Sequence, residues 1–462
     1  MQTSDLHPQP TTAIHSRWRR IITPFPVPES IPIIERLRAV EPKSNAGLPP
    51  VLWDQAEGFT VRDHYGNQWI DMTSAIMLTN IGHAHPKLIK AIHQAADHKL
   101  ITSYAFPSEA RLKLLEKLVQ ISPIHDSKAI LFSTGTEATE TAMMLMRRHG
   151  QQIHPEKRVI LSFENGYHGR TLAATLASGS RQTTDWITRE SVHHHQIPFP
   201  FAPTCPANHL PPDDCNPKCF HRALWNLENQ AIQPEHIAGI IVEPMPGWAT
   251  WPIANAYARE MQTWARKHDI LICFDEVQSG CGRTGKLFAC EHLDIIPDLM
   301  TLGKGLSSSL PVSAVIGNAQ LLDGPAPGEM SSTHGGNPFC AQVALANLQI
   351  LEDECLVEAS EKTGKLLLDE LNKLKQSHPS RLLSIHGRGL FISAHLKRPD
   401  NGEPDIEFAD AIVAEAVRRG VLMFVTGRGF IKFSPPLCIE PEAAIEAAEV
   451  IRDCFFALAK PD

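Results

Sequence analysis

Apolar runs of strand length alternate with amphipathic helical segments between residues 84 and 335, and this alternation constrains the possible fold most strongly. Amphipathic helices are expected at 85–97 and 108–121. The strand-like runs that follow are, in order, KAILF, VILSF, AGIIVE, ILICFD, DLMTL and SAVIG. Apolar strands separated by helices are typical of a mostly parallel sheet with helices on both faces. The sequence therefore predicts an α/β fold whose large domain spans 84–336.

The segments on either side predict a smaller α/β domain, built from 51–83 and 337–462. Its expected elements are short strands at 59–63 and 68–71, a long helical stretch after 337, the strands GLFISAHL, VLMFV and FIKFS, and helices at 410–419 and 441–459. Residues 1–50 are rich in proline and show little periodicity, so they are expected to form an arm that lies over a partner subunit.

Charge and composition exclude several classes of partner. The net charge is -8 and there is no long basic run, so neither nucleic acid nor an anionic membrane is expected as a partner. The apolar runs are too short to span a bilayer and the first residues lack the apolar core of a signal peptide, which predicts a cytoplasmic location. The ten cysteines are irregularly spaced, which favours reduced thiols over disulfides.

Chemically informative residues come directly after the predicted strands, where open α/β sheets bind ligands. After KAILF, Gly135 and Thr136 begin a helix whose N–H groups and dipole can hold a phosphate, although such a step is also an ordinary capped turn. After VILSF come Tyr167, which can stack on a flat ring, and His168, which can supply a polar contact. Both are also compatible with ordinary core or loop positions.

Asp275 ends the run ILICFD, and Lys304 follows it by 29 residues, between two glycines. A lysine amine forms a Schiff base with an aldehyde, and pyridoxal phosphate is the aldehyde cofactor whose ring nitrogen needs a carboxylate partner. Gln278 is expected to contact the ring's phenolic oxygen if the backbone stays extended, and Val277 to pack on the ring. An ion-paired acid and a solvated loop lysine are the alternatives. The order of these residues along the chain, each after a strand, favours the cofactor.

These motifs resemble the class III aminotransferases, fold type I pyridoxal-phosphate enzymes that include ornithine and 4-aminobutyrate aminotransferases. The resemblance covers about 50–455 through GNQWIDMTSAIMLTNIGHAHP, STGTEATE, YHGRT, IIVEP, FDEVQSGCGRTGK, TLGKG, STHGGNP and IKFSPPLCIEP. It implies that Lys304 is the Schiff-base lysine and proton shuttle and that Asp275 pairs with the ring nitrogen. The other residues expected to bind pyridoxal 5′-phosphate are Gly135, Thr136, Tyr167, His168, Glu243, Val277, Gln278 and Thr333.

The resemblance also implies a homodimer with shared active sites, in which Thr333 completes the phosphate site of the neighbouring subunit. Glu243 is expected to support Asp275 from behind. The implied reaction is a transamination that moves an amino group from an ω-amino acid or another primary amine to a keto acid. Racemisation or epimerisation of amino acids and decarboxylation of dialkylglycines, which occur among relatives, are the alternatives.

Two positions depart from the family pattern in a way that bears on the substrate. Relatives that alternate an ω-amino acid with 2-oxoglutarate commonly carry a glutamate after the EP motif and an arginine before the PP motif. This chain has Trp248 and Lys432 there. Lys432 can attract a carboxylate but lacks the bidentate fork of arginine, and Trp248 either enlarges an apolar pocket wall or packs in the core. Further candidates for the pocket are Ile76, Met77, Phe106, Arg170, which matches an arginine that binds a distal carboxylate, and Arg428.

A metal-binding role of segment 193–221 is a third hypothesis. The segment contains His193, His194, His195, Cys205, His209, Cys215, Cys219 and His221. Their spacing lacks the paired C-x2-C of a zinc site, so no metal ligand is predicted from it.

Overall fold

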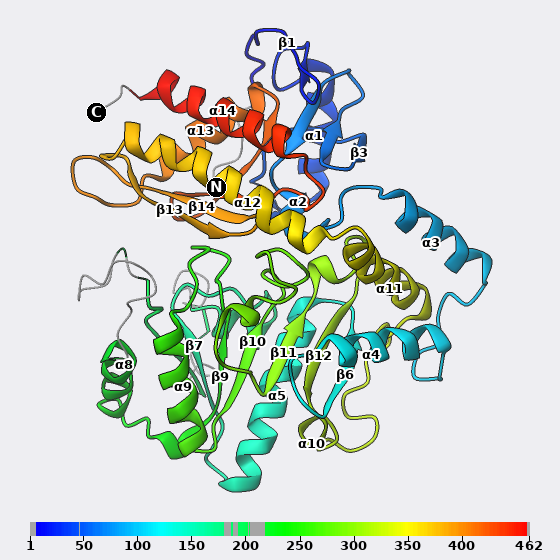
Figure 1. The fold of residues 1–462 in the computed structure, drawn as a ribbon, viewed down its shortest axis with the longest axis vertical. Coiled ribbons are helices and arrows are strands. Elements are labelled where there is room, and N and C mark those ends of the chain that lie inside the picture. Colours follow the sequence, from blue (N-terminus) through cyan, green and yellow to red (C-terminus); the bar gives the residue numbers. More distant parts are fainter. Residues whose placement is uncertain are drawn as a thin grey trace. The chain divides into compact units, whose positions relative to one another are not determined.

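Two compact units make up the chain (Figure 1). The large unit is Pro86–Glu354, and the terminal unit combines Met1–His85 with Cys355–Asp462. The computed structural model describes residues 6–45, 47–179, 186–187, 193–201, 203 and 218–459.

The large unit is built on a mixed, mostly parallel sheet, as the sequence predicts. In pairing order the described strands are β6 (Ser127–Phe132), β12 (Ser313–Asn318), β11 (Leu299–Leu302), β10 (Leu271–Asp275), β9 (Ile237–Val242), β7 (Val159–Phe163) and β8 (His194–Ile197). Strands β11, β10, β9, β7 and β8 pair in parallel, whereas β12 runs antiparallel to both β11 and β6. Strand β8 was not expected from the sequence.

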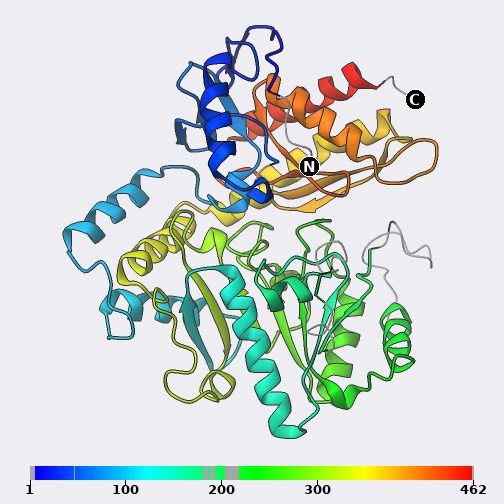
Figure 2. The same cartoon turned by 180° about the vertical axis from the view of Figure 1, so that it is seen from behind.

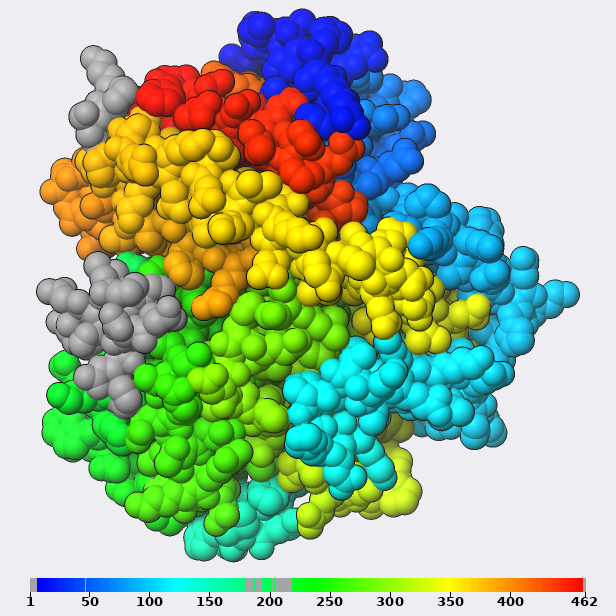
Figure 3. All heavy atoms as spheres, in the orientation of Figure 1, coloured from blue at the N-terminus to red at the C-terminus, as the bar shows by residue number. Residues whose placement is uncertain are grey.

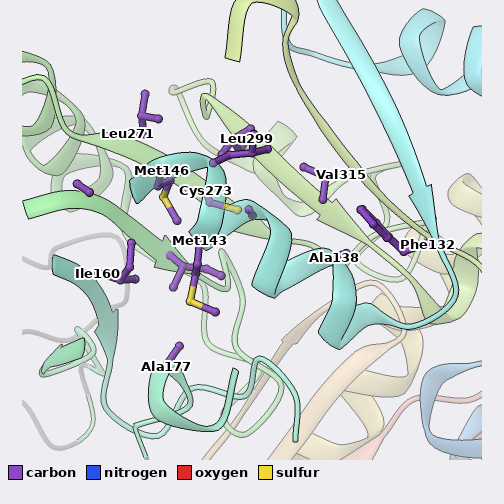
Figure 4. Close-up of a cluster of buried hydrophobic side chains, with 14 residues drawn as sticks. Phe132, Ala138, Met143, Met146, Ile160, Ala177, Leu271, Cys273, Leu299 and Val315 are labelled. Atoms are coloured by element: carbon purple, nitrogen blue, oxygen red, sulfur yellow. The ribbon is translucent and has the colours of Figure 1, made fainter. Parts of the chain in front are cut away.

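Helix α5 (Gly135–Ile153) covers one face of this sheet, and α9 (Asn255–Lys267) contacts it from the other (Figures 1 and 2). Helix α5 begins with a capping box, in which the Thr134 side chain accepts a hydrogen bond from the Glu137 N–H and the Glu137 carboxylate accepts one from the Thr134 N–H. Apolar side chains at helical spacing then reach the sheet. The cluster in Figure 4 joins them to Phe132, Ile160, Cys273, Leu299 and Val315.

The other described helices of the large unit connect or flank these strands. They are α3 (Pro86–Asp97), α4 (Glu109–Ile121), α6 (Leu172–Ala177), α8 (Lys218–Glu228), α10 (Ala319–Leu322) and α11 (Pro338–Asp353). Helix α11 differs from the expectation, which put residues after 336 in the smaller domain. It belongs to the large unit because it packs on α3 and α4, and the surfaces of α4 and α11 adjoin in Figure 3. Cys355, with a left-handed φ of 50°, separates it from the next helix.

The described part of the terminal unit forms two further sheets and three long helices. One sheet has the order β1 (Ile14–His15), β2 (Arg20–Ile21), β5 (Gln68–Asp71), β4 (Thr60–Arg62), β3 (Gln55–Glu57), with β15 (Val421–Leu422) also on β5. The other is β13 (Leu382–Arg388), β14 (Phe391–Leu396), β17 (Phe430–Phe433), β16 (Phe424–Thr426). The helices are α12 (Leu356–Ser377), α13 (Ile406–Arg418) and α14 (Pro441–Leu458), beside the short α1 (Ile31–Val40) and α2 (Ser74–Met77).

The first 50 residues are more regular than expected. Strand β2 pairs with β5 at Arg20 and Gln68, and α1 is a full helix, so this segment takes part in the terminal unit. The parallel pairing of β15 with β5 joins the two ends of the chain. No helix among the described residues is long and apolar enough to cross a membrane. The eight cysteines among them are free thiols.

We predict that Leu299→Ala lowers the free energy of unfolding by about 2–5 kcal/mol, because it leaves a cavity beneath α5. Leu299 is fully buried in the core of the large sheet, whereas Leu112 of α4 is 53% exposed. Leu112→Ala is the matched control and should cost about 0.5 kcal/mol or less. Urea unfolding followed by tryptophan fluorescence measures both, and equal losses would contradict this assignment of the core.

Candidate active site

Loops at the carboxyl ends of five strands bring the predicted cofactor residues of the large unit together. Gly135 follows β6, Tyr167 follows β7, Glu243 follows β9, Asp275 ends β10 and Lys304 follows β11. Strands β7, β9, β10 and β11 are parallel, and β6 runs in the same direction because β12 is antiparallel to both of its neighbours. Their carboxyl ends therefore meet at one edge, where such sheets bind ligands.

A buried carboxylate and imidazole form the centre of the site. His168 Nδ1 and Asp275 Oδ2 lie 2.7 Å apart, and both side chains are almost fully buried. Asp275 Oδ1 accepts hydrogen bonds from Thr301 Oγ1 at 2.9 Å and the Val277 N–H at 3.1 Å. His168 Nδ1 is the one donor to Oδ2 among the described residues, so that oxygen has capacity for one more. A protonated ring nitrogen fits this capacity.

The pairing with Asp275 shifts the pKa of His168. Burial alone would lower the pKa of His168, but the hydrogen bond to Asp275 and the nearby carboxylates of Asp275 and Glu243 raise the pKa above its ordinary value. The backbone of His168 is fixed as well, because its N–H donates to Ser178 Oγ at 2.9 Å and its carbonyl accepts from Thr139 Oγ1 at 2.7 Å. These contacts hold the imidazole of His168 against the carboxylate of Asp275.

Glu243 links three loops of the site. It accepts hydrogen bonds from the Tyr167 N–H at 2.9 Å, the Gly247 N–H at 2.9 Å and Gln278 Nε2 at 3.3 Å. Burial raises the pKa of Glu243, and the charge of His168 opposes this shift. Glu243 therefore holds the segment that carries Tyr167 and His168 next to the turn that carries Gln278.

Gln278 lies in a turn and not on the extended backbone expected from the sequence. The backbone does not stay extended beyond Asp275, because residues 277–280 form a turn and the Val277 N–H bonds back to Asp275. The side-chain amide of Gln278 donates to Glu243 in this arrangement. Val277 packs against the start of α5, where a Cβ added to Gly135 would lie 2.8 Å from Val277 Cγ1. Glycine at 135 is therefore required for this close approach.

Lys304 lies at the edge of the same site. Its φ of 42° is left-handed, an uncommon backbone for a residue other than glycine and one that is often found at functional sites. Its Nζ lies 5.9 Å from the centre of the Tyr167 ring. Burial lowers the pKa of Lys304, while Asp275 and Glu243 oppose the shift. A lysine with a lowered pKa is a better nucleophile and base near neutral pH.

The start of α5 provides a place for an anion. The first N–H groups of a helix have no acceptor within the helix, and the dipole favours negative charge there. Thr136, in the first turn, places its hydroxyl 2.8 Å from that of Thr171. These groups fit a phosphate, as the buried Asp275 fits a ring nitrogen and Lys304 fits an aldehyde.

The other predicted residues occupy more varied positions. Arg170 lies with its guanidinium carbon 5.0 Å from the centre of the Tyr167 ring. Trp248 is partly exposed and packs edge-on against Phe199 and Phe201. Thr333 is exposed, on a loop that Ser332 attaches to Glu137 at 3.2 Å.

Phe106 is 75% exposed, so its predicted role in the pocket has no support from burial.

The substrate candidates Ile76, Met77, Arg428 and Lys432 belong to the terminal unit. Lys432 is buried, and its Nζ lies 3.8 Å from Met77 Sδ. The same nitrogen lies 5.4 Å from the centre of the Phe391 ring and 5.5 Å from the centre of the Phe424 ring. Ser74, Ala75, Ile76 and Met77 all have left-handed φ angles between 49° and 65°. A run of four such residues is strained, which marks this turn as a place where side-chain position matters.

The histidine- and cysteine-rich segment shows no metal centre in its described part. Cys205, His209 and Cys215 lie outside the described residues. Among the described residues, no group of three potential ligands is placed to bind a metal. His194 receives a hydrogen bond from Arg147, and His221 lies 2.9 Å from Glu260.

Several supporting residues were missed from the sequence. Thr301 pairs with Asp275 across β10 and β11 and donates to its carboxylate. The signal was present, since Thr301 is the one hydroxyl in the apolar run DLMTL. Ser178 and Thr139, which hold His168, are not marked by any local pattern because they act from distant positions in the chain.

Comparison with known proteins shows the family to which the chain belongs. The model of the family "Aminotransferase class-III" matches residues 42–455. A 4-aminobutyrate aminotransferase of Mycobacterium leprae is 29% identical over 441 residues, 94% of this chain and 97% of the relative. A leucine/methionine racemase of Thermococcus litoralis is 30% identical over 422 residues, 90% of this chain and 93% of the relative.

A solved structure of a transaminase from the marine bacterium Virgibacillus has a TM-score of 0.83 and 25% identity, and covers 93% of this chain and 99% of its own. With the family match, this shows that the chain belongs to the class III aminotransferases and has their fold. It is an aminotransferase whose sequence is similar to that of 4-aminobutyrate aminotransferases.

Glu276, beside Asp275, gives the site a pH-dependent stability. It is fully buried, and its carboxylate accepts hydrogen bonds from Ser279 Oγ and, at 2.7 Å, from the Cys290 N–H. Burial raises the pKa of Glu276 to about 7, against these hydrogen bonds. The folded protein therefore binds this proton more tightly than the unfolded chain, so the contribution of Glu276 to stability falls as the pH rises from about 4.5 to about 7.

We predict that the free energy of unfolding of the wild type, measured relative to that of Glu276→Gln, falls by up to about 3 kcal/mol as the pH rises from about 4.5 to about 7. Above that pH the difference should stay constant. Urea unfolding at a series of pH values measures it. Glu228→Gln, at the exposed end of α8, is the control and should follow the wild type throughout. A difference that does not change with pH would contradict a raised pKa at Glu276.

Proposed function

We propose that this aminotransferase uses pyridoxal 5′-phosphate to move an amino group from an ω-amino acid, or a more apolar primary amine, to a keto acid. The observation that carries the proposal is Asp275, a buried carboxylate with capacity for one more donor, near enough to Lys304 to act on its pKa. Gly135 and Thr136 would hold the phosphate, Tyr167 and Val277 the ring, and Gln278 its phenolic oxygen. When bound, this cofactor withdraws electrons from the donor carbon.

The residues of the chain supply binding and proton transfer. The hydrogen bond between His168 and Asp275 fixes the position of the carboxylate that would pair with a protonated ring nitrogen. With the cofactor bound, Lys304 would hold its aldehyde carbon covalently. Once a donor amine takes that place, the freed Nζ, whose pKa is lowered by burial, would move a proton between the donor carbon and the cofactor. The keto acid reverses the same proton transfers.

The donor is proposed from the charges available beside Tyr167. Arg170 is exposed and lies next to the ring, where it can bind a carboxylate distal to the reacting amine. Lys432 stands where relatives that use 2-oxoglutarate commonly carry an arginine, and it offers a carboxylate a single point charge in place of a bidentate fork. Trp248 stands where those relatives commonly carry a glutamate, and it offers an apolar surface instead. Ile76 and Phe106 are proposed as substrate-contacting residues from the sequence.

The proposed assembly is a homodimer in which Thr333 completes the phosphate site of the partner subunit. The exposure of Thr333 and the attachment of its loop through Ser332 are compatible with that role. A cytoplasmic location, without nucleic acid or membrane as a partner, stays a prediction from composition.

A racemase is the second candidate, because the Thermococcus litoralis relative is named as one. The two reactions differ in their need for a second substrate. An amine added alone to a transaminase would consume the aldehyde form of the cofactor and shift its absorbance. A keto acid such as pyruvate or 2-oxoglutarate would then restore the original absorbance. A racemase inverts its amino acid without a keto acid, so inversion by chiral chromatography without such a shift would favour racemisation.

We predict that Lys304→Ala abolishes transamination and the visible absorbance band of the lysine-bound cofactor, because no other amine replaces it. The fold should be retained, as judged by circular dichroism. Lys286→Ala removes an exposed lysine from the loop after Asp275 and is the matched control, expected to keep both band and activity. Full activity in Lys304→Ala would show that the covalent role lies elsewhere.

We predict that Arg170→Leu raises the KM for 4-aminobutyrate roughly tenfold to a hundredfold, since a charge-assisted hydrogen bond to the donor carboxylate is lost. The KM for butylamine, which has the same chain without the carboxylate, should change little. Arg259→Leu, on the outer helix α9 and paired with Asp294, should leave both values unchanged. Equal changes in KM for the two donors would show that another residue binds the donor carboxylate.

A further inference from the structure

One face of α5 holds the loop that carries the ring-contacting residues. Thr136, Thr139 and Glu140 are three and four positions apart and therefore lie on the same side of the helix. Each contacts the segment 168–174. Thr136 Oγ1 lies 2.8 Å from Thr171 Oγ1, Thr139 Oγ1 donates to the His168 carbonyl at 2.7 Å, and Glu140 Oε1 accepts the Ala173 N–H at 3.1 Å.

Thr171 stands at the N-cap of α6 but does not cap it. A threonine at this position normally accepts a backbone N–H of the first turn, yet the Thr171 side chain makes no capping hydrogen bond. Glu140 of α5 supplies the cap instead, through Ala173 and, at 3.4 Å, Ala174. The hydroxyl of Thr171 is thereby available to Thr136.

Gly169 brings the loop close enough for this contact. Its φ of 135° lies in the region that favours glycine, and an added Cβ would lie 2.2 Å from Thr136 Oγ1. Any side chain at 169 would therefore displace the Thr136 hydroxyl. The backbone of the loop and the hydroxyl of Thr136 are fitted to each other at the start of α5.

An anion at the start of α5 would decide which hydroxyl donates in the hydrogen bond between Thr136 and Thr171. A hydroxyl has one proton to donate and two lone pairs that accept. If Thr136 gives its proton to an anion at the helix start, its lone pair must receive the proton of Thr171. Thr171 then fixes the rotation of the Thr136 hydroxyl and prevents the proton from turning away.

We propose that Thr171 is a positioning residue for the phosphate group, acting through Thr136 at the start of α5. This inference rests on the proposed function, because it requires a ligand with a phosphate. It assigns Glu140 a matching part, since the cap from Glu140 is what releases Thr171 from α6. A merely structural tie between loop and helix would affect every ligand of the site equally, whereas orientation of the Thr136 hydroxyl affects only ligands with a phosphate.

The test compares Thr171→Val and Thr171→Ser with the wild type, all freed of cofactor. Dissociation constants are measured for pyridoxal 5′-phosphate and for pyridoxal by absorbance, and for inorganic phosphate by calorimetry. Thr171→Val should weaken the two phosphate ligands roughly three- to tenfold, the effect of one lost hydrogen bond, and change pyridoxal less than twofold. Thr171→Ser should bind all three as the wild type does. Thr263→Val deletes a hydroxyl bonded within α9 and is the control.

Two outcomes would overturn the inference. Wild-type affinity for the phosphate ligands in Thr171→Val would show that Thr136 needs no orientation, and an equal loss for pyridoxal would show a structural role only. The proposed function is judged separately, on the wild-type protein. If its visible band forms and depends on Lys304 while Thr171→Val binds normally, only the role of Thr171 fails. If the wild type forms no such band, both fail.

Discussion

The buried pair of His168 and Asp275 is the interaction on which the rest of the site depends. A carboxylate with almost no exposure is costly unless it is paired and hydrogen-bonded, and here an imidazole, a threonine hydroxyl and a backbone N–H share that task. Each partner comes from a different element of the sheet edge. The ends of β7, β10 and β11 must therefore be in register before the charge can be buried, which couples the fold of the large unit to its chemistry.

Much of this arrangement could be predicted because it follows from local patterns. Apolar runs mark the strands, and the residues that follow them mark the edge at which ligands bind, so the meeting of Asp275, Lys304 and Tyr167 at one edge could be predicted. The roles proposed for them are those that the family resemblance implies. The capping of α5 by Thr134 and Glu137 is also a local pattern, readable in STGTEATE.

What could not be predicted depends on contacts between distant parts of the chain. Helix α11 belongs to the large unit through its packing on α3 and α4, which its own periodicity does not reveal. The turn that places Gln278, the links from Ser178 and Thr139 to His168, and the burial of Lys432 beside Met77 are likewise tertiary. Trp248 illustrates the limit well, since its aromatic neighbours come from segments that have no recognisable motif.

Helix α6 has six residues and takes its cap from a carboxylate on α5, which has consequences for how the protein folds. A helix this short is not stable alone, because nucleation costs more than one turn of hydrogen bonds returns. It can therefore form only after α5 is in place, so the loop that carries Tyr167 and His168 is assembled late. The large unit would reach its native sheet before this loop is complete, and capture of the proposed cofactor would follow.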